Sequence, residues 1–226
     1  MIPLLLRAAA LAAPFLLIAC GGASSESGTK GEPANEQLTV EPKKSVDSAD
    51  MVIGSPDAKV TVIEYASLTC PHCATFHETI FPALKEKYVD TGRVKFIFRE
   101  FPTPPAEFSY IGSVLARCAA EKNGSDAYFA VIGALFRTQR TWIFGDNPKA
   151  ELLKVAGQVG MDEATFDACL KRQDLIDAIN KRVEEGAEKY SITGTPSFVI
   201  DGEKVTAHTE EDFEKILDEK LAKVTG

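Results

Sequence analysis

A Cys-Pro-His-Cys turn that directly follows an apolar strand segment constrains this chain more than any other feature. Residues 59–67, KVTVIEYAS, are rich in β-branched side chains and predict a buried strand. A helix is expected to begin at the two cysteines and to run to about Asp90, with a kink at Pro82. The first sulfur is therefore expected where a strand ends and a helix begins.

This junction favours redox chemistry at Cys70 and Cys73. The unpaired amides and the positive dipole end of the helix stabilise a thiolate, so the pKa of Cys70 should fall below its ordinary value of about 8.5. Pro71 suits the start of a helix, and His72 adds a donor or a positive charge near Cys70. Cys73 lies one turn into the helix and is expected to be the buried resolving thiol. We interpret the pair as a thiol–disulfide exchange site that needs no cofactor.

Other interpretations of the two cysteines are weaker. A structural disulfide that encloses only two residues would gain little chain entropy. A zinc site could use Cys70, Cys73 and His77, but the sequence offers no second pair of ligands to complete a tetrahedral set. We therefore expect no metal, and we expect His77 on the helix surface. Thiols without a role are not expected in an exported chain.

The N-terminal segment indicates export. It reads MIPLLLRAAALAAPFLLIAC and has one charge, Arg7, followed by twelve apolar residues, which suits a signal peptide and is short for a bilayer span. Its end, residues 17–20, resembles the lipobox of bacterial lipoproteins, in which the cysteine, here Cys20, is lipidated and becomes the first residue of the mature chain. Cleavage to a soluble secreted product and an uncleaved anchor are the alternatives. In each case the other cysteines enter an oxidising compartment.

The rest of the chain alternates between strand and helix signals. Residues 21–50 lack aromatic side chains and predict a flexible tether. A second strand is expected at 93–101, where Val94, Phe96 and Phe98 alternate with charged residues. A block of helices follows to about residue 190, and it includes one that starts at Pro148 and one capped by Asp162. The remaining expected elements are a hairpin around Asp201-Gly202 and a closing amphipathic helix.

This order predicts an α/β fold in which a small βαβ…ββα layer is interrupted by an inserted all-helical domain. The expected divisions are a signal peptide at 1–19, a lipidated, flexible tether at 20–50, the first half of the α/β layer at 51–104, the inserted helical domain at 105–190 and the second half at 191–226.

Three stretches together resemble the DsbA-like branch of the thioredoxin superfamily: VIEYASLT, CPHC and, far downstream, GTPSFVIDG. The resemblance covers roughly residues 51–224 and implies a thioredoxin fold with a helical insertion. It implies that Cys70 is the attacking cysteine and Cys73 the resolving one. Pro196 matches the family's cis-proline, which helps to bind the partner's chain. Glu64 matches an acidic residue beneath the active site, which could take the proton of Cys73; a solvent-exposed carboxylate is the alternative.

One position departs from the enteric oxidase pattern. Thr195 precedes the proline where those oxidases usually have valine and disulfide isomerases have threonine, so the resemblance leaves oxidase and isomerase open. Those isomerases are dimers built through a folded N-terminal domain, whereas a monomer is expected here. Away from this site, Cys118 and Cys169 lie on apolar helix faces and are expected to pair as a structural disulfide; two free buried cysteines are the alternative.

The sequence therefore predicts a thiol–disulfide oxidoreductase on the periplasmic side of a bacterial envelope, lipid-anchored or soluble. Its expected partners are reduced exported proteins, contacted near Thr195 and Pro196, and a DsbB-like membrane reoxidant. An isomerase, a reductant and a non-catalytic peptide-binding lipoprotein remain alternatives. A formal net charge of −8 argues against binding to nucleic acid by charge.

Overall fold

The computed structural model describes residues 50–225. The expected signal peptide, the lipidation site at Cys20 and nearly all of the tether lie outside this range. Within it, no helix combines the length and the apolar character that a membrane crossing requires.

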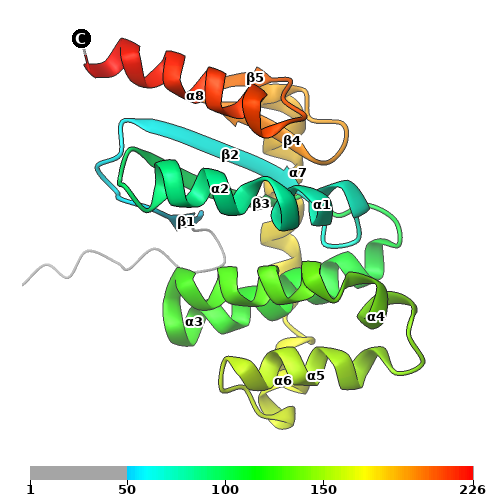
Figure 1. The fold of residues 1–226 in the computed structure, drawn as a ribbon. Helices are drawn as coiled ribbons and strands as arrows, with labels where there is room; N and C mark the ends of the chain where they lie inside the picture. The colour runs from blue at the N-terminus through cyan, green and yellow to red at the C-terminus, as the bar shows by residue number, and fades with distance from the viewer. Residues whose placement is uncertain (1–49, 226) are drawn as a thin grey trace, which may run out of the picture. The chain divides into compact units, whose positions relative to one another are not determined.

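A five-stranded mixed sheet forms the centre of the α/β layer (Figure 1), in the order β1-β3-β2-β4-β5. The strands are β1 (Met51–Ile53), β2 (Val60–Ala66), β3 (Val94–Glu100), β4 (Ser197–Ile200) and β5 (Glu203–Val205). Strands β2 and β3 are parallel, and the other neighbours are antiparallel. The turn between β4 and β5 has positive φ at Asp201 (48°) and Gly202 (83°), which is the hairpin geometry expected of this pair. The short edge strand β1 was not predicted.

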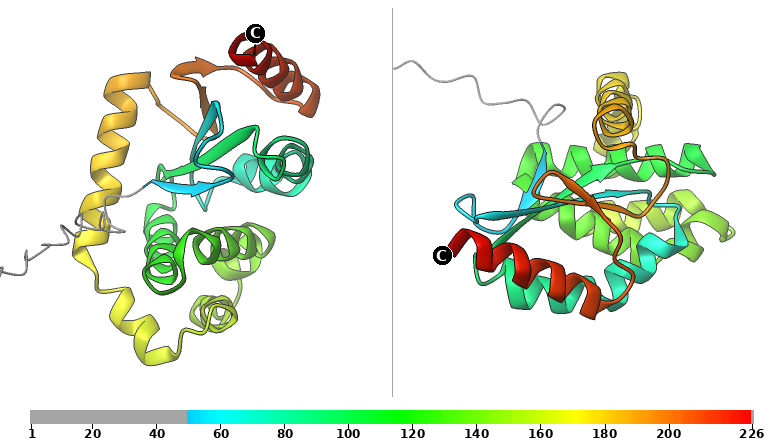
Figure 2. Two further views of the ribbon diagram at one scale, coloured as in Figure 1. Left: turned by 90° about the vertical axis from the view of Figure 1, so that its left-hand side faces the viewer. Right: turned by 90° about the horizontal axis from the view of Figure 1, so that it is seen from above.

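Helices cover both faces of the sheet (Figure 2). On one face lie α1 (Pro71–Thr79), α2 (Phe81–Leu84), the π-helix η1 (Lys85–Val89) and α8 (Glu210–Thr225); on the other lies α7 (Gln173–Tyr190). The predicted kink near Pro82 is present, because α1 ends at Thr79 and α2 begins two residues later. On the α7 face, Tyr65 packs so closely against Gly186 that an added Cβ atom would lie 2.5 Å from the tyrosine ring.

The insertion between β3 and β4 is entirely helical. It contains α3 (Ala106–Arg137), α4 (Gln139–Phe144), α5 (Pro148–Gln158) and α6 (Glu163–Cys169), and α7 leads back to the sheet. The long α3 is interrupted at Gly124, where φ is 76° and the backbone leaves the helical conformation. The predicted helix start at Pro148 is present, with Asn147 accepting from the Ala150 amide, and Asp162 is the predicted cap, accepting from the Thr165 amide. The short α4 was not predicted.

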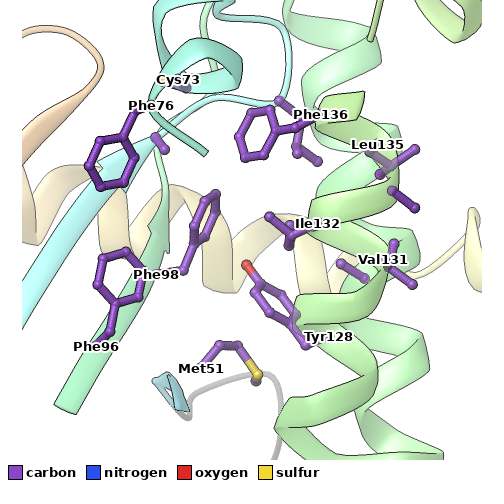
Figure 3. Close-up of a cluster of buried hydrophobic side chains, with 14 of the residues drawn as sticks. Met51, Cys73, Phe76, Phe96, Phe98, Tyr128, Val131, Ile132, Leu135 and Phe136 are labelled. Carbon is purple, nitrogen blue, oxygen red and sulfur yellow. The ribbon is translucent and has the colours of Figure 1, made fainter. Parts of the chain in front are cut away.

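One apolar core joins the two parts of the fold. Figure 3 shows its centre, where Phe96 and Phe98 of β3 face Tyr128, Ile132 and Phe136 of α3. Cys73 and Phe76 of α1 lie at one edge of this cluster. Cys73 is therefore buried where the α/β layer meets the helical insertion.

Candidate active site

The CPHC segment occupies the turn between β2 and α1. Cys70 caps the helix with extended backbone angles (φ −81°, ψ 118°), and Pro71 is the first helical residue, as its missing N–H favours. His72 is exposed, whereas Cys70 is 8 % exposed and Cys73 is fully buried. Both cysteines are free thiols in the structure. One sulfur is therefore close to the surface and the other lies in the core.

The surroundings of Cys70 favour its thiolate. A hydrogen bond from the Cys73 thiol is the largest cause, and it lowers the pKa of Cys70 to about 5 against the opposing effect of burial. The Thr195 side chain and the backbone of Cys73 and His72 act in the same direction as that bond. The fall in the pKa agrees with the prediction from the helix terminus, although the neighbouring thiol contributes more than the backbone. At neutral pH Cys70 is a nucleophile and a good leaving group.

Cys73 has the opposite character. Burial raises its pKa, and the hydrogen bond to Cys70 and the charge of Glu64 raise it further. Glu64 lies on β2 and is itself fully buried, so the alternative of a solvent-exposed carboxylate is excluded. His77, one turn after Cys73, contacts this carboxylate: its Nε2–H donates to Glu64 Oε2 over 2.7 Å. The expectation of His77 on the helix surface was wrong, since its side chain is only 6 % exposed.

The loop before β4 places the predicted proline beside Cys70. The Thr195–Pro196 peptide bond is cis, and the Cys70 thiol donates to the Thr195 carbonyl oxygen over 3.4 Å. A groove of about 560 Å³ opens next to this contact. Its walls come from α1, the cis-proline loop, strands β4 and β5, and the chain from β5 into α8. They include His72, Phe76, Pro196, Lys204, His208 and Phe213. A groove lined by both aromatic and polar side chains next to Cys70 is suited to an extended peptide segment.

The helical insertion also forms hydrogen bonds with the CPHC turn. Sequence reasoning missed this contact. Gln139, at the start of α4, donates from Nε2 to the carbonyl oxygens of Leu68 (2.8 Å) and Cys70 (3.0 Å). A buried polar side chain usually forms hydrogen bonds, often with the backbone. The sequence could not show which backbone groups Gln139 contacts, because Gln139 lies 69 residues from Cys70.

The proline-rich segment that follows β3 borders the same turn. Thr69, the residue before Cys70, donates from its hydroxyl to the Thr103 carbonyl oxygen over 2.8 Å. Ser67 accepts from the Thr103 amide (3.1 Å) and shares a hydrogen bond with Ser109 of α3. The loop after β3, the cis-proline loop and two helices of the insertion, α3 and α4, therefore contact the segment that carries Cys70.

The predicted structural disulfide lies within the helical insertion. Cys118 of α3 and Cys169 of α6 form a disulfide with a Cα–Cα distance of 6.2 Å, which joins two helices of the insertion. Trp142 is fully buried and donates to the Leu135 carbonyl oxygen, so it is a packing residue of the insertion. No group of three or more His, Cys, Asp or Glu side chains suited to a metal occurs between residues 50 and 225.

With this geometry established, comparison with known proteins decides the family. A family model described as thioredoxin matches residues 47–219. The chain belongs to the thioredoxin family. Among solved structures it is similar to α-DsbA1 from Wolbachia pipientis, with a TM-score of 0.67, 30 % sequence identity, and coverage of 77 % of this chain and 92 % of that one. The predictions of a DsbA-like protein-disulfide oxidoreductase and of a thioredoxin fold with a helical insertion are therefore confirmed.

Sequence relatives point the same way. The DsbA-like chain is 31 % identical to a relative in Rickettsia typhi, named by inference as a protein-disulfide oxidoreductase, over 84 % of this chain and 68 % of the relative. It is also 26 % identical to disulfide bond formation protein D of Bacillus subtilis, and the match covers 86 % of this chain and 85 % of that protein. The chain spans between 62 and 68 % of the length of the rickettsial relatives it matches.

Proposed function

We propose that this DsbA-like enzyme introduces disulfides into exported proteins through Cys70 and Cys73. A substrate thiolate attacks the Cys70 sulfur of the oxidised pair, a mixed disulfide forms, and a second substrate thiol releases the product while the enzyme keeps two thiols. The observation that carries this proposal is the environment of Cys70. A thiolate stabilised at neutral pH favours the reduced enzyme and therefore makes its disulfide a strong oxidant.

The groove beside the cis-proline supports a protein substrate. We propose that Thr195 and Pro196 contact the backbone of the substrate and that side chains near its cysteine enter the groove. The reduced enzyme then needs an oxidant, and a DsbB-like membrane protein would supply that step. The Bacillus subtilis relative, named as a disulfide bond formation protein, supports the direction of electron flow.

The location is the second part of the proposal. The lipobox-like segment before Cys20 supports export and lipid attachment, which would hold a monomeric domain on a bacterial membrane through the residue 20–50 tether. Intact mass measured on the chain extracted from membranes would show a lipid-modified Cys20 at the N-terminus. An unmodified mature chain in the soluble fraction would contradict the anchor.

The reduction potential of the Cys70–Cys73 pair tests the direction. We expect a value near that of a strong oxidant, about −120 mV, and far above the value of about −270 mV typical of thioredoxin. The full chain, purified in detergent, would be equilibrated in glutathione buffers, alkylated and examined by mass spectrometry to count its thiols. A value close to that of thioredoxin would assign the enzyme to the reductants and overturn the proposed direction.

A further inference from the structure

The buried Glu64–His77 pair contains a feature that the exchange reaction leaves unexplained. Oε2 of Glu64 accepts from His77, but Oε1 has no hydrogen-bond partner among the described residues and is shielded from solvent. A buried carboxylate oxygen without a donor is costly, and such groups call for a specific reason. Glu64 also acts electrostatically on Cys73. The carboxylate that carries this unpartnered oxygen therefore acts on a sulfur that must gain and lose a proton.

The positions of these groups follow from the fold. Cys73 and His77 lie four residues apart on α1, so their side chains occupy the same face of the helix, one turn from each other. Glu64 lies on β2, the central strand of the sheet that this face of α1 covers. One oxygen of this carboxylate is hydrogen-bonded to the imidazole, and the other is left without a partner beneath the helix that carries Cys73.

The surroundings of the pair are apolar. The ring of His77 stacks on Phe136 with a centroid distance of 4.5 Å and lies 4.9 Å from that of Phe81. The other buried carboxylate nearby is Glu100, two residues beyond the β3 neighbour of Glu64, and it is engaged by Arg117 and Arg182. In such surroundings a second negative charge beside Glu64 would be strongly unfavourable.

We propose that His77 is a positioning and proton-holding residue for Cys73, and that it acts through Glu64. The pair shares one proton, held either on the carboxyl group or on the imidazole. This inference rests on the proposed exchange reaction at Cys70 and Cys73. It identifies which group keeps the proton that the resolving cysteine needs.

The shared proton moves when a substrate attacks the disulfide. A substrate thiolate forms a bond to the Cys70 sulfur, the Cys70–Cys73 bond breaks, and its electron pair goes to the Cys73 sulfur. Cys73 takes the shared proton from the pair and becomes a thiol, which leaves an ionised Glu64 that still accepts from the Nε2–H of a neutral His77. The substrate sulfur is oxidised, Cys73 is reduced, and one negative charge moves from sulfur to carboxylate. The 6 % exposed edge of His77 allows the pair to regain its proton from water.

The test compares two variants of the full chain, purified in detergent. His77→Gln keeps an N–H donor for Glu64 but cannot hold the shared proton, and Glu64→Gln removes the carboxylate. The rate at which each oxidised protein reacts with a reduced cysteine-containing peptide would be measured from pH 5 to 9. Glu78→Gln, an exposed neighbour on the same helix, is the matched control, and thermal unfolding would verify that each variant is folded.

We expect His77→Gln to slow the reaction at neutral pH by about tenfold to a hundredfold and to flatten its pH profile, because general acid–base catalysis commonly contributes that much or more. In the Glu64→Gln background, the same change should add no further loss, since both residues act in one step. An active wild type with an unchanged rate and profile in His77→Gln would overturn the inference. A wild type that does not oxidise the peptide at all would instead overturn the proposed function.

Discussion

Replacing Cys70 by serine is expected to abolish disulfide transfer, with a loss on the order of a thousandfold or more, as for the removal of other enzymatic nucleophiles. The structure gives the reason: Cys70 is the sulfur near the surface, it has a lowered pKa, and it lies beside both the cis-proline and the groove. The measurement is the oxidation of a reduced two-cysteine peptide by the oxidised enzyme, followed by mass spectrometry.

Cys73→Ser provides the matched variant. It keeps the nucleophile but lacks the resolving thiol, so the Cys70 thiol should accumulate mixed disulfides with oxidised peptides instead of releasing them. In the reduced wild type, alkylation of Cys70 by iodoacetamide should reach half its maximal rate near pH 5, and this titration should disappear in Cys70→Ser. Unimpaired peptide oxidation by Cys70→Ser would show that the reaction does not pass through the CPHC turn and would contradict the proposed role of Cys70.

The α/β frame could be predicted because its signals are local. The strand of residues 59–67, the hairpin at Asp201-Gly202 and the helix caps each depend on residues close in sequence, and the structure contains all of them. The three-residue β1 lacks such a signal, since its strand structure comes from pairing with β3. The short α4 was also missed, because six residues are too few for an amphipathic pattern.

In the candidate site, too, local features could be predicted from the sequence and contacts between distant elements could not. Spacing and junction placement are sufficient to single out Cys70 and Cys73 as candidates, and the predicted direction for the pKa of Cys70 agrees with its surroundings in the structure. They do not reveal Gln139 or the contact between His77 and Glu64, because these partners meet only after distant elements pack together. Sequence reasoning also placed His77 on the surface, since histidine at a helical position is more often exposed than buried.

The helical insertion therefore does more than cover the sheet. Gln139 and Ser109 reach from its helices to the segment that carries the reactive cysteine, and Phe136 stacks on His77. At the other side of the shared core, β3 ends in Glu100, which the helices surround with opposite charges. The ion pairs of Glu100 with Arg117 and Arg182 are therefore a second point at which the helices are bound to the sheet.

Glu100→Gln is expected to lower the free energy of unfolding by about 3 to 5 kcal/mol, because removing one partner of a buried ion pair leaves the other charge insufficiently compensated. Glu100 is fully buried and accepts from Arg117 over 2.6 and 2.8 Å, from Arg182 over 3.3 Å and from the Tyr128 hydroxyl over 2.8 Å. Urea unfolding of the full chain with its Cys118–Cys169 disulfide intact would measure the change. Glu163→Gln, in an exposed ion pair with Lys149, should cause no measurable change.

The same carboxylate makes stability depend on acid pH. Burial alone would raise the pKa of Glu100, but the charge and hydrogen bonds of Arg117, with Arg182 and Tyr128, outweigh it and lower the pKa to about 2, from 4.5 in an unfolded chain. A depressed pKa stabilises the fold above the unfolded value, and this contribution of about 3 kcal/mol is lost as the pH falls from about 5 towards 2. Between about pH 5 and pH 2, the free energy of unfolding should therefore fall less in Glu100→Gln than in the wild type. If the free energy of unfolding fell equally with pH in the two proteins, the pKa of Glu100 would not be lowered by Arg117 and Arg182.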